Sequence, residues 1–186
     1  WEIGRNIQSG KIVLDLMKPM DYRKYMFWSC SGGFVTNFFF TFLPTFIAVT
    51  AVTQGRIHFG INLFFFIISV AMAVSINYSI DFIVSTICLY TESIWGINIM
   101  KQVIVLLLSG ASIPIAFFPE PLKTIVYYLP FQSVYNAPLS ILLDAESQPQ
   151  TVFTTLGIQF LWCIAMMVIS KLFWKISLRQ ITVNGG

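Results

Sequence analysis

Four long apolar runs, separated by short polar stretches, dominate the pattern of this 186-residue chain. They cover about residues 29–53, 59–80, 94–113 and 152–173. Because a helix rises about 1.5 Å per residue, a run of about 20 apolar residues spans the hydrocarbon core of a bilayer. The pattern therefore predicts an all-α fold, a polytopic membrane helix bundle in which four spans are present.

Three polar or helix-breaking residues within these runs are expected to affect the shape or the ends of the spans. Pro44 lacks a backbone donor and is expected to kink the first span. A carboxylate at the bilayer centre costs about 3 kcal/mol on insertion scales, so Asp81 is expected near the end of the second span or facing other helices. We favour the end of the span over an ion or proton site, because no second intramembrane carboxylate supports a relay. Lys101, early in the third span, is expected to extend to the lipid headgroups.

The stretch from about residue 114 to 144 is apolar but cannot be a straight span. Prolines remove backbone donors and force turns, and its aromatic side chains suit the membrane interface. Short re-entrant helices that dip into one face of the membrane satisfy both facts. A gating role and a sealing cap remain open alternatives. The prolines that break it are Pro114, Pro119, Pro121, Pro130 and Pro138.

Residues 1–21 form a separate amphipathic segment, and residues 22–186 form a single transmembrane domain. Ile3, Ile7, Leu14 and Met17 recur at helical spacing, which predicts an apolar stripe on one side of a helix. Gly10 is expected to interrupt this helix, and Lys18-Pro19 to end it. The spacing fits equally well a helix in the lipid headgroups or a docking helix for a partner in the cytoplasm.

The basic residues indicate an orientation. With the N-terminal segment and the C-terminus in the cytoplasm, nine Lys and Arg residues lie inside and two outside, which together make the 11 of the chain. Such a bias follows the positive-inside rule. The two outer residues are Arg56 and Lys123, so the broken segment opens on the extracytoplasmic face.

Composition narrows the function. The chain is 56% hydrophobic and 10% charged, so membrane lipid is its expected solvent, and a net charge of +3 gives no reason to expect a nucleic-acid partner. Cys30, Cys88 and Cys163 are expected to be buried hydrophobes rather than metal ligands, and the lone His58 a loop residue. No catalytic constellation, metal site or phosphate-binding loop is present in the sequence. We therefore do not expect an enzyme. We expect a channel, an ion-coupled carrier or the membrane part of a machine whose energy comes from another protein.

Two stretches then resemble a known family. GKIVLDLMKPMDYRKY precedes the spans, and LSGASIPIAFFPEPLKTIVYYLPFQSVYNAPLSILL precedes the last, Trp-bearing span with its basic end. Their order and spacing resemble the permeases of bacterial type-2 ATP-binding cassette (ABC) exporters over nearly the whole chain. A basic position usually occupied by Arg in that family is Lys18 here, which keeps the charge but not the bidentate fork.

The resemblance implies a permease subunit with six spans in the bacterial cell membrane, of which this chain, starting at Trp1, would lack the first two. The first segment would dock on a separate ABC ATPase that holds the ATP and Mg, so no cofactor is expected in this chain. A second permease, in a homo- or heterodimer, would face it across the substrate path. The implied coupling residues are Ile3, Ile7, Lys11, Leu14, Met17, Lys18 and Pro19. The implied re-entrant gate contains Gly110, Pro114, Phe118, Pro119, Pro130, Phe131 and Pro138.

The alternative from another class is a self-contained channel or ion-coupled secondary carrier, and a structural assembly factor is a more distant one. The apolar, aromatic composition suits an amphipathic drug, lipid or peptide as cargo, without selecting among them.

Overall fold

The structure is a computed structural model and describes residues 2–52, 61–91, 94–143 and 149–181. These residues form helices, and three helical stretches are long and apolar enough to span a membrane. The first joins α3 (Tyr22–Asn37), the π-helical η1 (Phe38–Phe42) and α4 (Leu43–Val52). The others are α5 (Ile61–Ile87) and α9 (Pro149–Ile181). The predicted all-α membrane bundle is confirmed.

Shorter helices complete the described chain. Two lie at the N-terminus, α1 (Glu2–Gln8) and α2 (Lys11–Leu16), and they are separated at Gly10, whose φ of 72° favours glycine. The apolar α6 (Ile94–Leu108) precedes the broken segment. That segment contains η2 (Ile115–Phe117), α7 (Glu120–Tyr127), η3 (Pro130–Ser133) and α8 (Asn136–Leu143).

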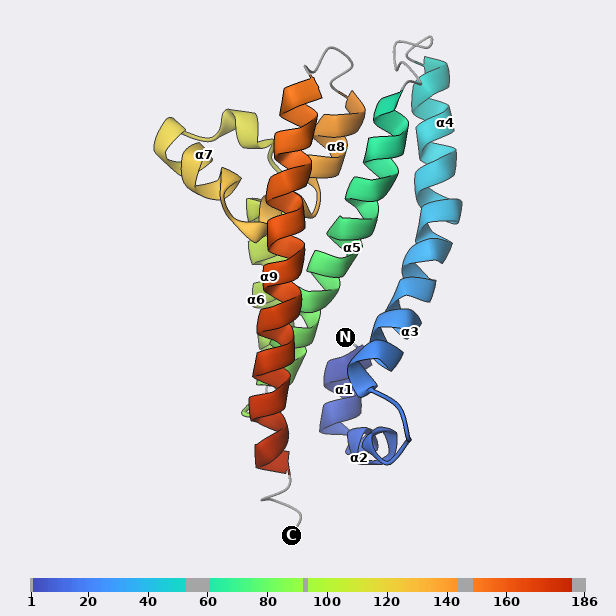
Figure 1. Cartoon of the computed structure of the whole chain (residues 1–186), viewed down its shortest axis with the longest axis vertical. Coiled ribbons are helices and arrows are strands. Elements are labelled where there is room, and N and C mark those ends of the chain that lie inside the picture. The colour runs from blue at the N-terminus through green and yellow to red at the C-terminus, as the bar shows by residue number, and fades with distance from the viewer. Residues whose placement is uncertain (1, 53–60, 92–93, 144–148, 182–186) are drawn as a thin grey trace.

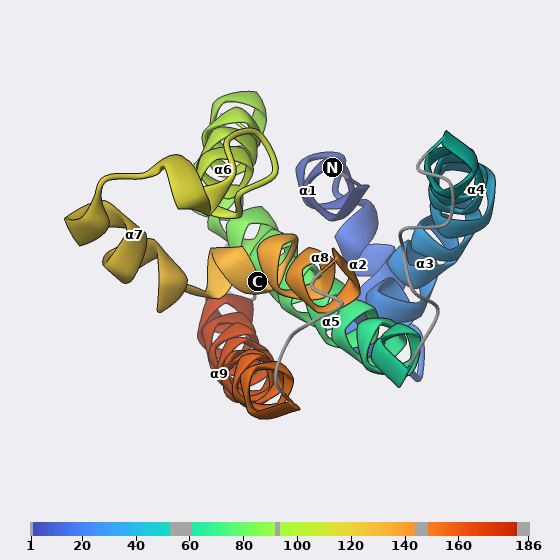
Figure 2. The ribbon, with the colours of Figure 1, turned by 90° about the horizontal axis from the view of Figure 1, so that it is seen from above.

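Helix α5 is the centre of the arrangement and packs most extensively on α9 and α8 (Figure 1). Seen from above, α6 lies beside α5, α3 and α4 lie on another side of it, and α7 projects away from the bundle (Figure 2). The helices α1 and α2 sit at the same end of the bundle as the last described turns of α9 (Figure 1).

Three apolar clusters hold these helices together. At the end near α1, Ile3 and Ile12 pack with aromatic side chains of α3, α5 and α9. In the middle, side chains of α5, α6, α9 and the broken segment meet around Ile76. Toward the other end, Phe66 of α5 packs with α8 and the start of α9. Among the membrane-spanning helices lipid is as apolar as these side chains, so close packing rather than exclusion of water makes the contacts stabilising there.

Several span boundaries differ from the predicted ones. The first helix starts at Tyr22 rather than near residue 29, because Asp21 caps it by accepting a hydrogen bond from the Arg23 backbone N–H at 3.0 Å. Around Pro44 the helix widens into the π-helical η1, in which Leu43 donates to the Phe38 carbonyl. This is the local distortion that a missing proline donor demands. The turn predicted at 54–58, including His58, lies outside the described residues.

Helix α5 continues past Asp81 to Ile87, so Asp81 is not at the helix end that we favoured. It faces another helix instead, which was the alternative expectation, because the carboxylate finds a cationic partner on α6. The third helix is shorter than predicted and ends at Leu108, since Gly110 turns the chain with a φ of 80°. The last helix is longer than predicted at both ends.

Candidate functional site

The N-terminal helices divide their apolar residues between two environments. Ile3 and Ile12 are buried against Tyr22, Phe82 and neighbouring aromatic rings of the bundle. In contrast, Leu14 and Met17 expose 65% and 78% of their surface. The helices α1 and α2 are therefore fastened to the bundle by one set of apolar side chains, while another set remains exposed.

Lys18, between α2 and α3, contacts residues of both helices. Its Nζ donates to Asp15 Oδ1 at 2.6 Å and lies 5.1 Å from the centre of the Tyr25 ring. The hydrogen bond to Asp15 raises the pKa of Lys18 above its ordinary value. The exposed Met17 and Pro19 lie on either side of Lys18, in a turn with backbone hydrogen bonds from the Lys18 N–H to the Asp15 carbonyl and from the Met20 N–H to the Lys18 carbonyl.

Of the seven predicted coupling residues, Ile3 is inside the bundle, whereas the described others are exposed. The exposed ones are Lys11, Leu14, Met17, Lys18 and Pro19, and the side chain of Ile7 lies outside the described residues. The single predicted stripe is thus two surfaces, because the turn at Gly10 gives α2 its own direction.

A joint near α1 and α2 connects them to three long helices. The rings of Tyr22 and Trp174 stack with centroids 5.4 Å apart, and Phe82 meets Trp174 edge-on at 5.2 Å. Arg23 Nη2 donates to Ser170 Oγ of α9 at 3.2 Å, and Tyr78 of α5 donates to the Arg23 carbonyl at 2.7 Å. These contacts link α1 and α2 to α3, α5 and α9 together.

The predicted gate residues fall into two halves of the broken segment. Pro114 and Pro119 are exposed and Phe118 half-buried, beside η2 and α7, whereas Pro130 and Pro138 are buried and Phe131 half-buried in η3 and α8. The φ of 80° at Gly110 favours glycine in the turn that starts the segment, and a Cβ there would lie 3.1 Å from Ile115 Cγ1, so that the Ile115 side chain would have to shift slightly.

A cleft of about 860 Å³ separates α3, η1 and α4 from α5. Phenylalanine rings form one part of its wall, and Phe42 stacks on Phe38 at 4.9 Å and on Phe66 at 5.5 Å. Polar side chains form two further rows, each at helical spacing, on the facing helices. These rows are Asn37, Thr41 and Thr45 on one side, and Asn77, Asp81 and Ser85 on the other.

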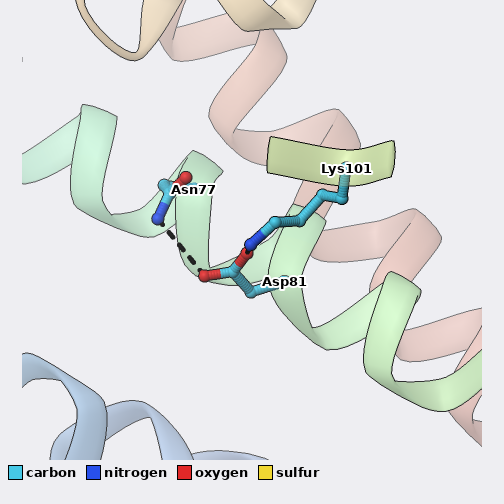
Figure 3. A network of polar contacts seen from close by, with 3 residues as sticks. All are labelled: Asn77, Asp81 and Lys101. Atoms are coloured by element: carbon cyan, nitrogen blue, oxygen red, sulfur yellow. Dashed lines mark hydrogen bonds and ion pairs between the residues drawn. The ribbon is translucent and has the colours of Figure 1, made fainter. Parts of the chain in front are cut away.

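Asp81 pairs with Lys101 of α6 and accepts a hydrogen bond from Asn77 Nδ2 at 3.4 Å (Figure 3). Lys101 therefore does not extend to the headgroups as predicted, because its side chain is 14% exposed and turned toward α5. Pairing of opposite charges is how ionisable groups are accommodated at membrane depth. The cleft thus holds a carboxylate whose charge is already compensated.

The sequence contained signals for features that were not predicted. Asp81 and Lys101 are opposite charges in adjacent apolar runs, which is a pairing signal. Gln159 is a polar residue within the last apolar run, and it is fully buried. Within the described part of the chain, no group of three His, Cys, Asp or Glu side chains could hold a metal ion.

Comparison with known proteins places the chain in a family. A family model described as ABC-2 family transporter protein matches residues 1–185. No curated protein and no solved structure matches the chain. The matched model covers nearly the whole chain, and three helices of the described residues are long and apolar enough to span a membrane. The chain therefore belongs to the ABC-2 transporter family, as a membrane-spanning permease subunit.

Proposed function

We propose that this permease subunit works in an ATP-driven exporter and couples to a separate ABC ATPase through α1 and α2. The observation that carries the proposal is the division of apolar residues in this region. Ile3 and Ile12 fasten the two helices to α3, α5 and α9, while Leu14 and Met17 remain exposed beside Lys11. A docking element needs both an outward contact surface and a rigid inward attachment.

In this mechanism the ATP and Mg bind to the partner, and the chain itself catalyses nothing. Closing of the ATPases displaces α1 and α2, and the aromatic joint around Trp174 passes the displacement to the long helices. The bundle then changes from an inward-facing to an outward-facing state. The substrate path forms where a second permease, identical or related, faces this one.

We further propose that the protein resides in the bacterial cell membrane with α1, α2 and the C-terminus in the cytoplasm. Basic residues at that end support this orientation through the positive-inside rule. They include Arg5, Lys11, Lys18, Lys24, Lys171 and Lys175. The broken segment then lies toward the extracytoplasmic face.

The test is affinity purification of the intact gene product from gently solubilised membranes. We expect a soluble protein with a GxxxxGK[ST] phosphate-binding loop in near-equal amount. Replacing Leu14 by Asp should lower its recovery at least about 30-fold, because about 2 kcal/mol of apolar contact is lost and a carboxylate is placed in the interface. Leu122→Asp, on the exposed side of α7, is the matched control and should leave recovery unchanged. Equal recovery of the ATPase with both variants contradicts coupling through α2.

One observation favours the second candidate, an ion-coupled carrier or channel. Asp81 lines the cleft from within the apolar helix α5, and carboxylates inside membrane-spanning helices often mark ion pathways. Its pairing with Lys101 and the lack of a second carboxylate among the described cleft residues favour the exporter. Flux through liposomes that contain the permease alone, without ATP and sensitive to Asp81→Asn, would establish the carrier instead.

A further inference from the structure

Gln159 of α9 connects three separate parts of the bundle. Its side chain is 0% exposed, and its Nε2 donates to the backbone carbonyls of Ser69 at 2.8 Å and Ser133 at 2.9 Å. Its Oε1 accepts from Ser69 Oγ at 2.7 Å. Both amide protons and the amide oxygen are thus used, as a buried amide in a membrane requires. One side chain therefore joins α5, η3 and α9.

The carbonyl of Ser133 explains why this contact matters to the broken segment. Ser133 is the last residue of η3, where carbonyls lack helical partners, and the chain turns there into α8. Gln159 supplies a donor to that carbonyl from outside the segment. The turn between η3 and α8 is consequently held against α5 and α9 by a hydrogen bond rather than by apolar contact alone.

The rest of η3 and α8 is packed into the bundle in the same way. Pro130, Ser133 and Ala137 are buried, and Ile141 belongs to the cluster around Phe66. We call residues 129–143 the inner half. Its packing on α5 is among the most extensive contacts of α5 (Figure 1).

The preceding residues, 115–128, are the outer arm and have few such contacts. Phe117 and Tyr128 expose 79% and 65% of their surface, and Val126 is the buried residue of α7. The arm projects from the bundle (Figure 2). At its end, the Tyr128 carbonyl accepts a hydrogen bond from Trp162 Nε1 of α9 at 3.1 Å. The arm is thus attached mainly through the buried Ile115 and Val126 and this hydrogen bond, whereas most of η3 and the inward side of α8 are buried.

We propose that Gln159 is a positioning residue that fixes the inner half to α5 and α9 throughout the transport cycle, so that only the outer arm moves when the path opens. The proposal rests on the ATP-driven permease function and specifies which part of the broken segment acts as the gate. Segments with few buried contacts open at low free energy, whereas packed and hydrogen-bonded ones do not.

The experiment is hydrogen–deuterium exchange, read by mass spectrometry, on the intact gene product with its ATPase in nanodiscs. The complex is compared without nucleotide and after trapping with ATP and vanadate. Peptides from 129–143 should exchange equally in both states, whereas peptides from 115–128 should differ at least about fivefold. State-dependent exchange within 129–143 of the unaltered protein overturns the proposal, whatever any variant does.

Variants test the part played by Gln159 itself. Gln159→Leu should speed exchange in 129–143 about tenfold, the effect of about one net hydrogen bond, and should make it depend on the nucleotide state. Gln159→Asn, which keeps the amide but is shorter, should have a smaller effect in the same peptides. Gln102→Leu, at an exposed position of α6, is the matched control and should change nothing there.

The outcomes separate this proposal from the proposed function. If no ATPase accompanies the permease, the proposed exporter function is wrong. Comparing hydrogen–deuterium exchange in 129–143 between Gln159→Leu and Gln102→Leu, in the permease alone, still decides whether Gln159 holds the inner half. Exchange in 129–143 that is unaffected by Gln159→Leu overturns the anchor in either preparation.

Discussion

The ion pair between Asp81 and Lys101 gives the sharpest quantitative prediction. It joins α5 to α6 inside the bundle, with Lys101 14% and Asp81 33% exposed. Breaking a fully buried pair by removing one partner costs about 3–5 kcal/mol, whereas a fully exposed pair contributes at most about 1 kcal/mol. The exposed fractions place this pair between those limits and nearer the first.

We therefore expect Lys101→Met and Asp81→Asn each to lower the free energy of unfolding by about 2–3 kcal/mol. Lys101→Met leaves the carboxylate with only the long hydrogen bond from Asn77, and Asp81→Asn leaves a largely buried ammonium group. The double substitution removes both charges. It should therefore cost no more than about 3 kcal/mol instead of the sum of about 5, a coupling of about 2 kcal/mol.

The measurement is a double-mutant cycle on protein in mixed micelles, with unfolding by denaturing detergent followed by tryptophan fluorescence. Lys171→Met, at an exposed position of α9, serves as the control and should change the free energy of unfolding by less than about 0.5 kcal/mol. If the two single effects add to that of the double variant within about 0.5 kcal/mol, the side chains do not interact and the geometry in Figure 3 is refuted.

Two further substitutions test the packing that positions the site. Gly110→Ala should lower the free energy of unfolding by about 1–3 kcal/mol, because the φ of 80° strains any L side chain and the new Cβ would crowd Ile115. Gly157→Ala is the control and should be neutral or stabilising, because this helical glycine has open space around it. Equal effects of the two substitutions would contradict the reasoning. Trp174→Ala should lower the unfolding free energy by about 3 kcal/mol through loss of its contacts with Tyr22 and Phe82, whereas the exposed Trp95→Ala should cost less than about 1 kcal/mol in the same assay.

Much of the fold was predictable because membrane-spanning segments are recognisable from the local sequence. The apolar runs, the turn at Gly10 and the short helices among the prolines follow from backbone chemistry and hydropathy within windows of the chain. The family resemblance also lay in local motifs and their order, and the family model over residues 1–185 confirms it. The coupling and gate residues stay predictions, since their roles involve partners and motion.

The failures concern side chains whose position depends on a partner in another helix. Asp81 was placed at the end of a span because an isolated carboxylate is costly at the bilayer centre, yet its charge is paired with a lysine on the next helix. Ile3 was grouped with Leu14 by spacing, although the turn at Gly10 sends one into the bundle and leaves the other exposed. In each case the decisive partner lies on another helix, and a single-helix pattern contains no information about it.

By itself, the sequence determined that this chain is a helical membrane protein with a broken segment before its last span, because lipid forces every backbone group to be paired within its own helix. Tertiary structure alone decided how the helices pair: Asp81 with Lys101, Gln159 with Ser69 and Ser133, and Ile3 with the aromatic joint. The physical reason is that packing and interhelical hydrogen bonds, unlike hydropathy, depend on which faces meet in space.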